Sequence, residues 1–287
     1  MKYLLGAFLF LLLIGINPAV FAQRSKSSGN GSKAVNLGST AAAVDTIAFR
    51  STAMKKQMKA VIIRPAAKPP AGGFPVVYLL HGFGGNFAQW ITKVPALPAL
   101  AEEYGCVIVC PDGGRMTLYF DNPLDSAYHF ESYFLQELIP YVESNYAVSR
   151  KRDYRAVAGL SMGGFGAFFF ASRRPDKFAA AVSLSGAMNV DKLAKYSNKA
   201  RSGVDSTCCS IQWKQFVEKD SVALSMECGI DDYLIGANRD MHRLLVQSNV
   251  PHDYTERPGK HDWLYWENAI PYQLLFLRRY WNDRLKN

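Results

Sequence analysis

The sequence predicts an α/β protein built on a mostly parallel sheet of about eight strands, with helices on both faces. Strand-like apolar runs alternate with amphipathic helical patterns such as residues 132–146 and 238–248. This alternation is typical of parallel sheets, because the chain must cross back over the sheet between neighbouring strands. Residues 46–64 depart from it, since they contain two consecutive strand-like runs. We expect these runs to form an antiparallel pair at the start of the sheet.

The length and charge of the chain favour a single domain with an ordinary solvated surface. The chain has 287 residues, of which 49% are hydrophobic, and no internal repeat; α/β folds of this size are commonly single domains. The formal net charge is +9, and the basic residues are scattered along the chain. A patch for an acidic polysaccharide or a membrane surface is the alternative interpretation. No nucleic-acid-binding motif is present, so we expect no nucleic-acid partner.

The first residues have the pattern of a secretory signal peptide. Lys2 precedes an apolar run over residues 3–16, and the small-residue site Val20-Phe21-Ala22 follows. The run is shorter than the roughly 18 apolar residues that a membrane span needs, which disfavours the alternative of an uncleaved anchor helix. We therefore predict a signal peptide over residues 1–22, a disordered Ser- and Gly-rich tether over 23–45 and a folded domain over 46–287. The expected location is secreted or periplasmic, without a stable membrane anchor.

A candidate nucleophile lies in Gly159-Leu160-Ser161-Met162-Gly163. A strand predicted at residues 154–158 runs into this segment, and a helix of small residues at 162–172 leaves it. A sharp strand-to-helix turn places the central side chain on a strained elbow, and the flanking glycines let neighbouring backbone pass close by. The pentapeptide alone is a weak signal, but this context predicts that Ser161 is a catalytic nucleophile.

A serine nucleophile needs a histidine base and an acid that orients it. Two aspartates, Asp231 and Asp232, follow the strand predicted at 222–228, and His261 lies in a Pro/Gly turn after the strand predicted at 252–256. Serine, aspartate and histidine thus occur in the order that this kind of site requires, each after a strand. From the residues alone, either aspartate could serve, the other capping the helix that begins near residue 234.

Two backbone N–H groups should stabilise the oxyanion that forms on the substrate. One belongs to Met162, directly after the nucleophile. For the other we predict Phe83, in the glycine-rich loop His81-Gly82-Phe83-Gly84-Gly85 that follows the strand at 76–80. We expect His81 to form a structural hydrogen bond there.

Aromatic and long-loop residues are candidates for substrate contacts. Trp90, Tyr119 and Trp263 could line an acyl pocket, with packing in the core as the alternative for each. Residues 187–220 form an unusually long connection, and we predict that they influence substrate selectivity.

The five cysteines do not form a disulfide framework or a metal site. Cys106 and Cys110 lie on one strand-like run, about 13 Å apart and too far to bridge. Cys228 is predicted to be a buried thiol at a strand end, and the adjacent Cys208 and Cys209 leave one bridge possible. No Cys or His pair has the spacing of a zinc site, so we expect no metal.

Several motifs together resemble the esterase D family, over the chain from about Thr46 to its end. The resemblance rests on residues 79–85 with Trp90, and on residues 111–114, 137–140, 158–166, 183–186, 228–232 and 259–263. The family includes tributyrin, feruloyl and acetyl esterases, S-formylglutathione hydrolases and mycolyltransferases. The resemblance implies an α/β-hydrolase fold, a serine triad and no organic cofactor. It also selects Asp232 as the acid, where the mycolyltransferase branch has a glutamate.

The motifs and the export signal lead to one functional hypothesis. We expect a secreted serine carboxylesterase that hydrolyses acetyl or feruloyl esters, as small molecules or linked to plant polysaccharide. An acyltransferase of the mycolyltransferase type and a thioesterase similar to S-formylglutathione hydrolase are the alternatives. A non-catalytic binding module on the same scaffold is disfavoured, because the serine, aspartate and histidine are all present.

Overall fold

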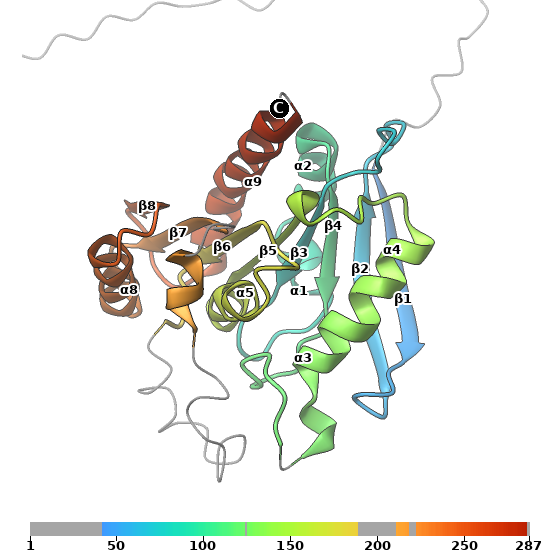
Figure 1. Ribbon diagram of the computed structural model, residues 1–287, viewed down its shortest axis with the longest axis horizontal. Coiled ribbons are helices and arrows are strands. Elements are labelled where there is room, and N and C mark those ends of the chain that lie inside the picture. The colour runs from blue at the N-terminus through green and yellow to red at the C-terminus, as the bar shows by residue number, and fades with distance from the viewer. Residues whose placement is uncertain (1–41, 124, 189–210, 218–221, 286–287) are drawn as a thin grey trace, which may run out of the picture. The chain divides into compact units, whose positions relative to one another are not determined.

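The computed structural model describes residues 42–123, 125–188, 211–217 and 222–285 (Figure 1). The predicted signal peptide, most of the predicted tether and most of residues 187–220, including Cys208 and Cys209, lie outside the described residues. The first strand begins at Ala43, inside the range predicted as tether. Its residues 43–45 pair with residues 62–64 of the next strand, so the regular structure starts before residue 46.

The sheet has eight strands in the order β1-β2-β4-β3-β5-β6-β7-β8. Their bounds are β1 Ala43–Arg50, β2 Gln57–Arg64, β3 Val76–Leu80, β4 Val107–Pro111, β5 Arg155–Leu160, β6 Ala180–Leu184, β7 Ala223–Gly229 and β8 His252–Arg257. Strands β3 to β8 are parallel, and β2 pairs antiparallel with both β1 and β4. The predicted antiparallel start and mostly parallel sheet are confirmed.

Helices cover both faces of the sheet and enclose a separate apolar core on each (Figure 1). One face carries α1 Gln89–Lys93, α2 Leu97–Tyr104 and α9 Trp263–Leu285. The other carries α3 Phe130–Ser132, a π-helical stretch Tyr133–Leu138, α4 Ile139–Asn145, α5 Met162–Arg173 and α8 Ile235–Gln247. Short 3₁₀ turns occur at Ser126–Tyr128, Arg152–Tyr154 and Trp213–Val217.

Burial along the strands follows their position in the sheet. Every residue of β3 and β5 is buried, because helices cover both sides of these central parallel strands. The edge strand β1 alternates between half-buried and exposed residues, as expected where one face meets water. Because β3 to β8 run parallel, their carboxyl ends lie along one edge of the sheet, where the loops after β3, β5, β7 and β8 can meet.

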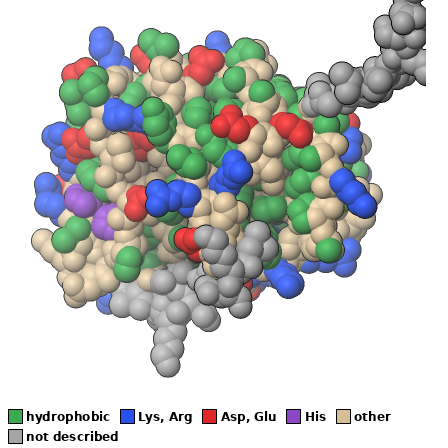
Figure 2. Space-filling model, turned by 90° about the horizontal axis from the view of Figure 1, so that it is seen from above, with side chains coloured by type: hydrophobic (Ala, Val, Ile, Leu, Met, Phe, Trp, Pro, Cys, Tyr) green, Lys and Arg blue, Asp and Glu red, His purple; other side chains and the backbone are tan. Residues whose placement is uncertain are grey.

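The buried thiol predicted at Cys228 and the absence of a bridge between Cys106 and Cys110 agree with the described structure. In the view of Figure 2, basic side chains are interspersed with acidic and apolar ones. Cys106, Cys110 and Cys228 are buried free thiols, and burial raises the pKa of Cys106 to about 12. Within the described ranges, no helix has the length and apolar character to cross a membrane.

Candidate active site

Ser161 occupies the turn between β5 and α5, with φ 52° and ψ −115°. Such positive-φ geometry is strained for a residue with a side chain, and it persists only where the surroundings hold it. The Ser161 N–H donates to the Leu184 carbonyl at 2.8 Å. A Cβ on Gly159 would lie 2.4 Å from the Gly163 oxygen, and one on Gly163 would lie 2.5 Å from the Leu80 oxygen. The two glycines therefore permit the close backbone approach on which the elbow depends.

Three side chains from three separate loops form one hydrogen-bonded chain. Ser161 Oγ lies 2.9 Å from His261 Nε2, and His261 Nδ1 lies 2.8 Å from Asp232 Oδ2. The Asp232 side chain is fully buried, whereas 13% of the His261 side chain is exposed. Loops after β5, β7 and β8 thus bring together the serine, acid and base predicted from the sequence.

The environment of Asp232 keeps its carboxylate ionised. Burial by itself raises the pKa of Asp232, but hydrogen bonds from His261, the Leu234 N–H and Ser185 outweigh it, so that the pKa lies below the usual range. An ionised acid can hold the imidazole in one tautomer and stabilise its cation.

Asp231 faces water. The prediction that the aspartate not bonded to His261 caps α8 is wrong, because no side chain caps the start of this helix. The Leu234 N–H, before the helix, instead donates to Asp232 Oδ1 at 2.8 Å. The Asp232 carboxylate therefore accepts from His261 through Oδ2 and from this turn through Oδ1.

The loop after β3 lies against the elbow. A Cβ on Gly82 would lie 2.5 Å from Leu160 Cδ1 and 3.4 Å from Ser161 Cβ. The next residue, Phe83, lines the same cleft as Ser161, and its N–H donates to no other residue in the described part of the chain. Met162 is the first residue of α5, so its N–H lies outside the helical ladder. Both predicted oxyanion donors are therefore available to a ligand.

Buried side chains support this loop from behind. His81 accepts from the Gly113 N–H through Nε2 at 2.8 Å and donates from Nδ1 to the Gly82 carbonyl at 2.8 Å. Burial lowers the pKa of His81, which favours this neutral form. The expected structural role of His81 therefore agrees with its contacts.

Two of the three predicted pocket aromatics belong to this support and do not line the cleft. Trp90 is fully buried and donates to the Leu80 carbonyl at 3.0 Å. The Tyr119 hydroxyl donates to the His81 carbonyl at 2.9 Å. The prediction that they line the pocket is wrong, because both side chains are buried and their polar atoms bond to the end of β3 and the loop after it.

The cleft at Ser161 has a volume of about 390 Å³ and a largely aromatic wall. Its lining consists of Gly82, Phe83, Gln89, Leu160, Ser161, Tyr233, His261, Asp262, Trp263 and Trp266. Trp263 was expected there, but Gln89, Tyr233 and Trp266 were not. The ring of Tyr233 lies 4.5 Å from that of His261, and Trp266 approaches the imidazole edge-on at 4.8 Å. Two signals in the sequence could have found them. Tyr233 directly follows Asp232, and Trp266 lies three residues after Trp263, about one helical turn away.

The arrangement offers hydrogen-bonding chemistry and no evident metal centre. Among the residues with described positions, no group of three or more His, Cys, Asp or Glu side chains could hold a metal ion. A polarised serine beside two free N–H groups is suited to attack on a carbonyl carbon.

Comparison with known proteins gives the chain its family. The family model with the description "Putative esterase" matches residues 51–277, from the turn before β2 into α9. The chain belongs to this esterase family. The esterase is a carboxylic ester hydrolase with an α/β-hydrolase fold, and its resemblance to the esterase D family is confirmed.

Relatives and solved structures cover most of this esterase. An acetyl esterase of Caldicellulosiruptor saccharolyticus is 28% identical over 256 residues, which span 79% of this chain and 95% of the relative. A fluorophosphonate-binding serine hydrolase of Staphylococcus aureus superposes with a TM-score of 0.75 at 25% identity, covering 83% of this chain and 99% of that one. A ferulic acid esterase superposes with a TM-score of 0.72 at 28% identity, covering 84% and 99%.

Proposed function

We propose that this esterase is an exported serine carboxylesterase in which Ser161, His261 and Asp232 form the catalytic triad. The hydrogen-bonded chain from Ser161 Oγ through His261 to Asp232, at 2.9 and 2.8 Å, is the observation that carries the proposal. It opens into a cleft of about 390 Å³, where an ester can reach the serine.

The geometry supports an acyl-enzyme mechanism. His261 Nε2 takes the Ser161 proton as Oγ attacks the ester carbonyl, and Asp232 stabilises the imidazolium that forms. The N–H groups of Phe83 and Met162 bind the oxyanion of the tetrahedral intermediate. His261 then protonates the departing alcohol. A water molecule activated by the same histidine attacks the acyl-enzyme, and collapse of the second intermediate releases the acid and restores Ser161.

The cleft favours short or aromatic acyl groups. Phe83, Tyr233, Trp263 and Trp266 give it flat apolar walls, and aromatic rings pack well against such surfaces. The resemblance to an acetyl esterase and a ferulic acid esterase points to the same two acyl classes. The signal-peptide pattern of residues 1–22 supports action outside the cytoplasm, where esters linked to plant polysaccharide are found.

The test is a panel of aryl esters from acetyl through butyryl to feruloyl, assayed with and without an acceptor alcohol. We expect hydrolysis of acetyl or feruloyl esters with the highest kcat/KM and free acid as the main product in both conditions. A fluorophosphonate probe should label the wild-type protein but not Ser161→Ala. An acylated alcohol as the main product would assign the protein to acyl transfer, and labelling of Ser161→Ala would exclude Ser161 as the nucleophile.

A further inference from the structure

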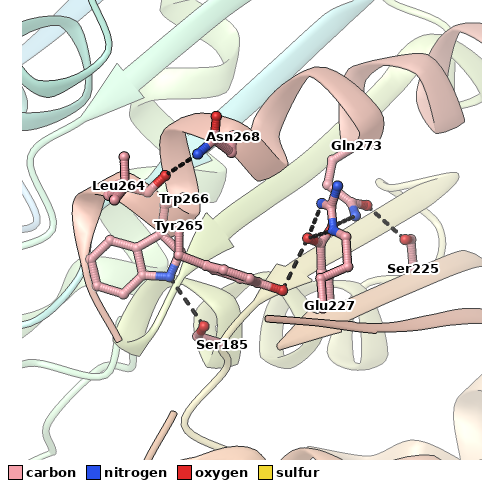
Figure 3. Close-up of polar contacts among 9 residues, drawn as sticks. Ser185, Ser225, Glu227, Leu264, Tyr265, Trp266, Asn268 and Gln273 are labelled. Carbon is pink, nitrogen blue, oxygen red and sulfur yellow. Dashed lines mark hydrogen bonds and ion pairs between the residues drawn. The ribbon is translucent and has the colours of Figure 1, made fainter. Parts of the chain in front are cut away.

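Glu227 is a buried carboxylate behind the catalytic loops, on the side of β7 that faces α9 (Figure 3). Only 1% of this residue is exposed, and four donor groups meet its two oxygens. Oε1 accepts from Arg257 Nε at 2.9 Å, from Arg257 Nη2 and from the Tyr265 hydroxyl at 3.1 Å. Oε2 accepts from Gln273 Nε2 at 2.6 Å. The mechanism proposed above gives this group no role.

The positions of its partners in the chain connect Glu227 to His261. Arg257 ends β8, Tyr265 lies in the first turn of α9, and each is four residues from His261. Both ends of the segment that carries the catalytic base are therefore held on the same carboxylate oxygen. Five residues after Glu227, the same strand and its loop deliver Asp232. One side chain thus anchors the elements of both partners in the Asp232–His261 hydrogen bond.

In the loop between β8 and α9, backbone hydrogen bonds to the loop after β7 hold only the half nearest to β8. The Ile230 N–H donates to the Arg257 carbonyl at 2.9 Å, and the Asp231 N–H donates to the Gly259 carbonyl at 3.0 Å. His261 and the start of α9 lie beyond these bonds. The contacts of Tyr265 and Gln273 with Glu227 attach that far half to the sheet (Figure 3), and Ser225 Oγ orients the Gln273 amide by donating to its oxygen at 2.7 Å.

The first turn of α9 also contacts the triad directly. Trp266 Nε1 donates to Ser185 Oγ at 3.1 Å (Figure 3), and the Ser185 side chain is one of the groups that lower the pKa of Asp232. The same indole lies edge-on to the His261 ring. A shift of α9 relative to β7 would therefore disturb the surroundings of both Asp232 and His261.

We propose that Glu227 is a positioning residue, which sets the alignment of His261 with Asp232 by fixing the Arg257–Tyr265 segment and the start of α9 against β7. It does not touch the substrate, so it acts on the catalytic step and leaves substrate affinity unchanged. This inference rests on the proposed triad. Its alternative is a buried ion pair that contributes to stability alone.

The experiment compares Glu227→Gln with Glu256→Gln. Glu256 is the control for these contacts, because its carboxylate also accepts from an arginine, Arg239 at 2.8 and 2.6 Å, and from a tyrosine, Tyr254 at 2.6 Å. Its side chain is more exposed, at 23% against 1% for Glu227. In folded Glu227→Gln we expect kcat on an aryl acetate to fall about 10- to 100-fold while KM changes less than about 3-fold, since small displacements of a catalytic group have effects of this size. Glu256→Gln should keep kcat within about 2-fold of wild type.

Two further variants keep the inference decidable. Tyr265→Phe removes a single hydroxyl, and it should lower kcat about 3- to 10-fold with unchanged KM even if Glu227→Gln does not fold. In an Asp232→Asn background, where the alignment is already lost, Glu227→Gln should lower the residual kcat less than about 2-fold more.

Three results would overturn the inference. The first is wild-type kcat in folded Glu227→Gln or, where that variant does not fold, in Tyr265→Phe. The others are an equal loss of kcat in Glu256→Gln, and losses of kcat from Glu227→Gln and Asp232→Asn that multiply fully in the double variant. A wild-type protein that fails to react with fluorophosphonate would instead contradict the proposed function, so the two failures are distinct.

Discussion

The two sides of the catalytic cleft are held in different ways. On the nucleophile side, the elbow that carries Ser161 is fixed by close backbone contacts, as the space around Gly159 and Gly163 shows. On the acid–base side, Asp232 and His261 depend on side chains that meet from distant parts of the sequence, among them Ser185 and Glu227. The nucleophile side is therefore sensitive to added atoms, and the acid–base side to lost charges and hydrogen bonds.

The largest effect is expected from removing the nucleophile itself. Ser161→Ala should lower kcat/KM by about 10⁴-fold or more, because the proposed mechanism has no other nucleophile to form the acyl-enzyme. Alanine fits the elbow in place of serine, so circular dichroism and melting temperature should stay near wild type. Retention of a tenth of the wild-type activity on an aryl acetate would refute the assignment of Ser161.

The two adjacent aspartates test the acid–base side. Asp232→Asn should lower kcat by up to about 10⁴-fold, since the base loses the partner that sets its tautomer. Asp231→Asn is the matched control and should retain nearly full kcat, because Asp231 is exposed. Steady-state assays of both purified variants decide the point. The opposite ranking would mean that Asp231 is the acid.

A single added methyl group should disturb the nucleophile side. In Gly163→Ala the new Cβ would lie 2.5 Å from the Leu80 oxygen and 2.7 Å from the His81 oxygen, so the backbone that leads to Phe83 must move. We expect kcat to fall about 10²-fold, together with a lower melting temperature. Gly236→Ala is the control, because its Cβ would meet nothing within 4 Å, and it should keep wild-type activity. Equal behaviour of the two variants would show that the elbow tolerates backbone movement.

Tyr233 tests how far the open rim of the cleft contributes. The residue is 75% exposed and its ring lies beside that of His261. Tyr233→Ala should raise KM for a feruloyl ester about 3- to 10-fold and leave kcat for an acetyl ester nearly unchanged, since one aromatic contact contributes about 1 kcal/mol. Tyr128→Ala, at an exposed tyrosine outside the cleft lining, should change neither value. The same KM for the feruloyl ester in both variants would place the acyl group elsewhere.

The smallest expected effect is the pH dependence of stability that Asp232 contributes. The pKa of this carboxyl is lower in the folded protein than its usual value, so its charge stabilises the fold above about pH 3.9. That contribution is lost as the pH falls through the lower folded pKa. Urea unfolding of wild type and Asp232→Asn should therefore show a difference in the free energy of unfolding that shrinks below about pH 4. A constant difference between pH 6 and pH 2.5 would contradict this expectation.

The nucleophile side was the more predictable from sequence, because its determinants are local. Ser161, its two glycines and the strand and helix around them lie within one short segment, and the pattern of small and apolar residues indicates the turn directly. The alternation of strands and helices similarly predicted the sheet and its antiparallel start, since periodicity reports which residues face the core. The order of the acid and base after later strands followed from the same alternation.

The sequence by itself thus determined the sheet, the elbow and the loops in which an acid and a base would lie. Only the tertiary structure decided which side chains converge there. It buries Asp232 and exposes Asp231, and it turns Trp90 into the core and Tyr233 toward the cleft. The partners of Glu227 likewise lie 30 to 46 residues away in the sequence. The physical reason is that local periodicity reports burial along one element, whereas contacts between elements depend on the register of β6, β7 and β8 and on the packing of α9 against them.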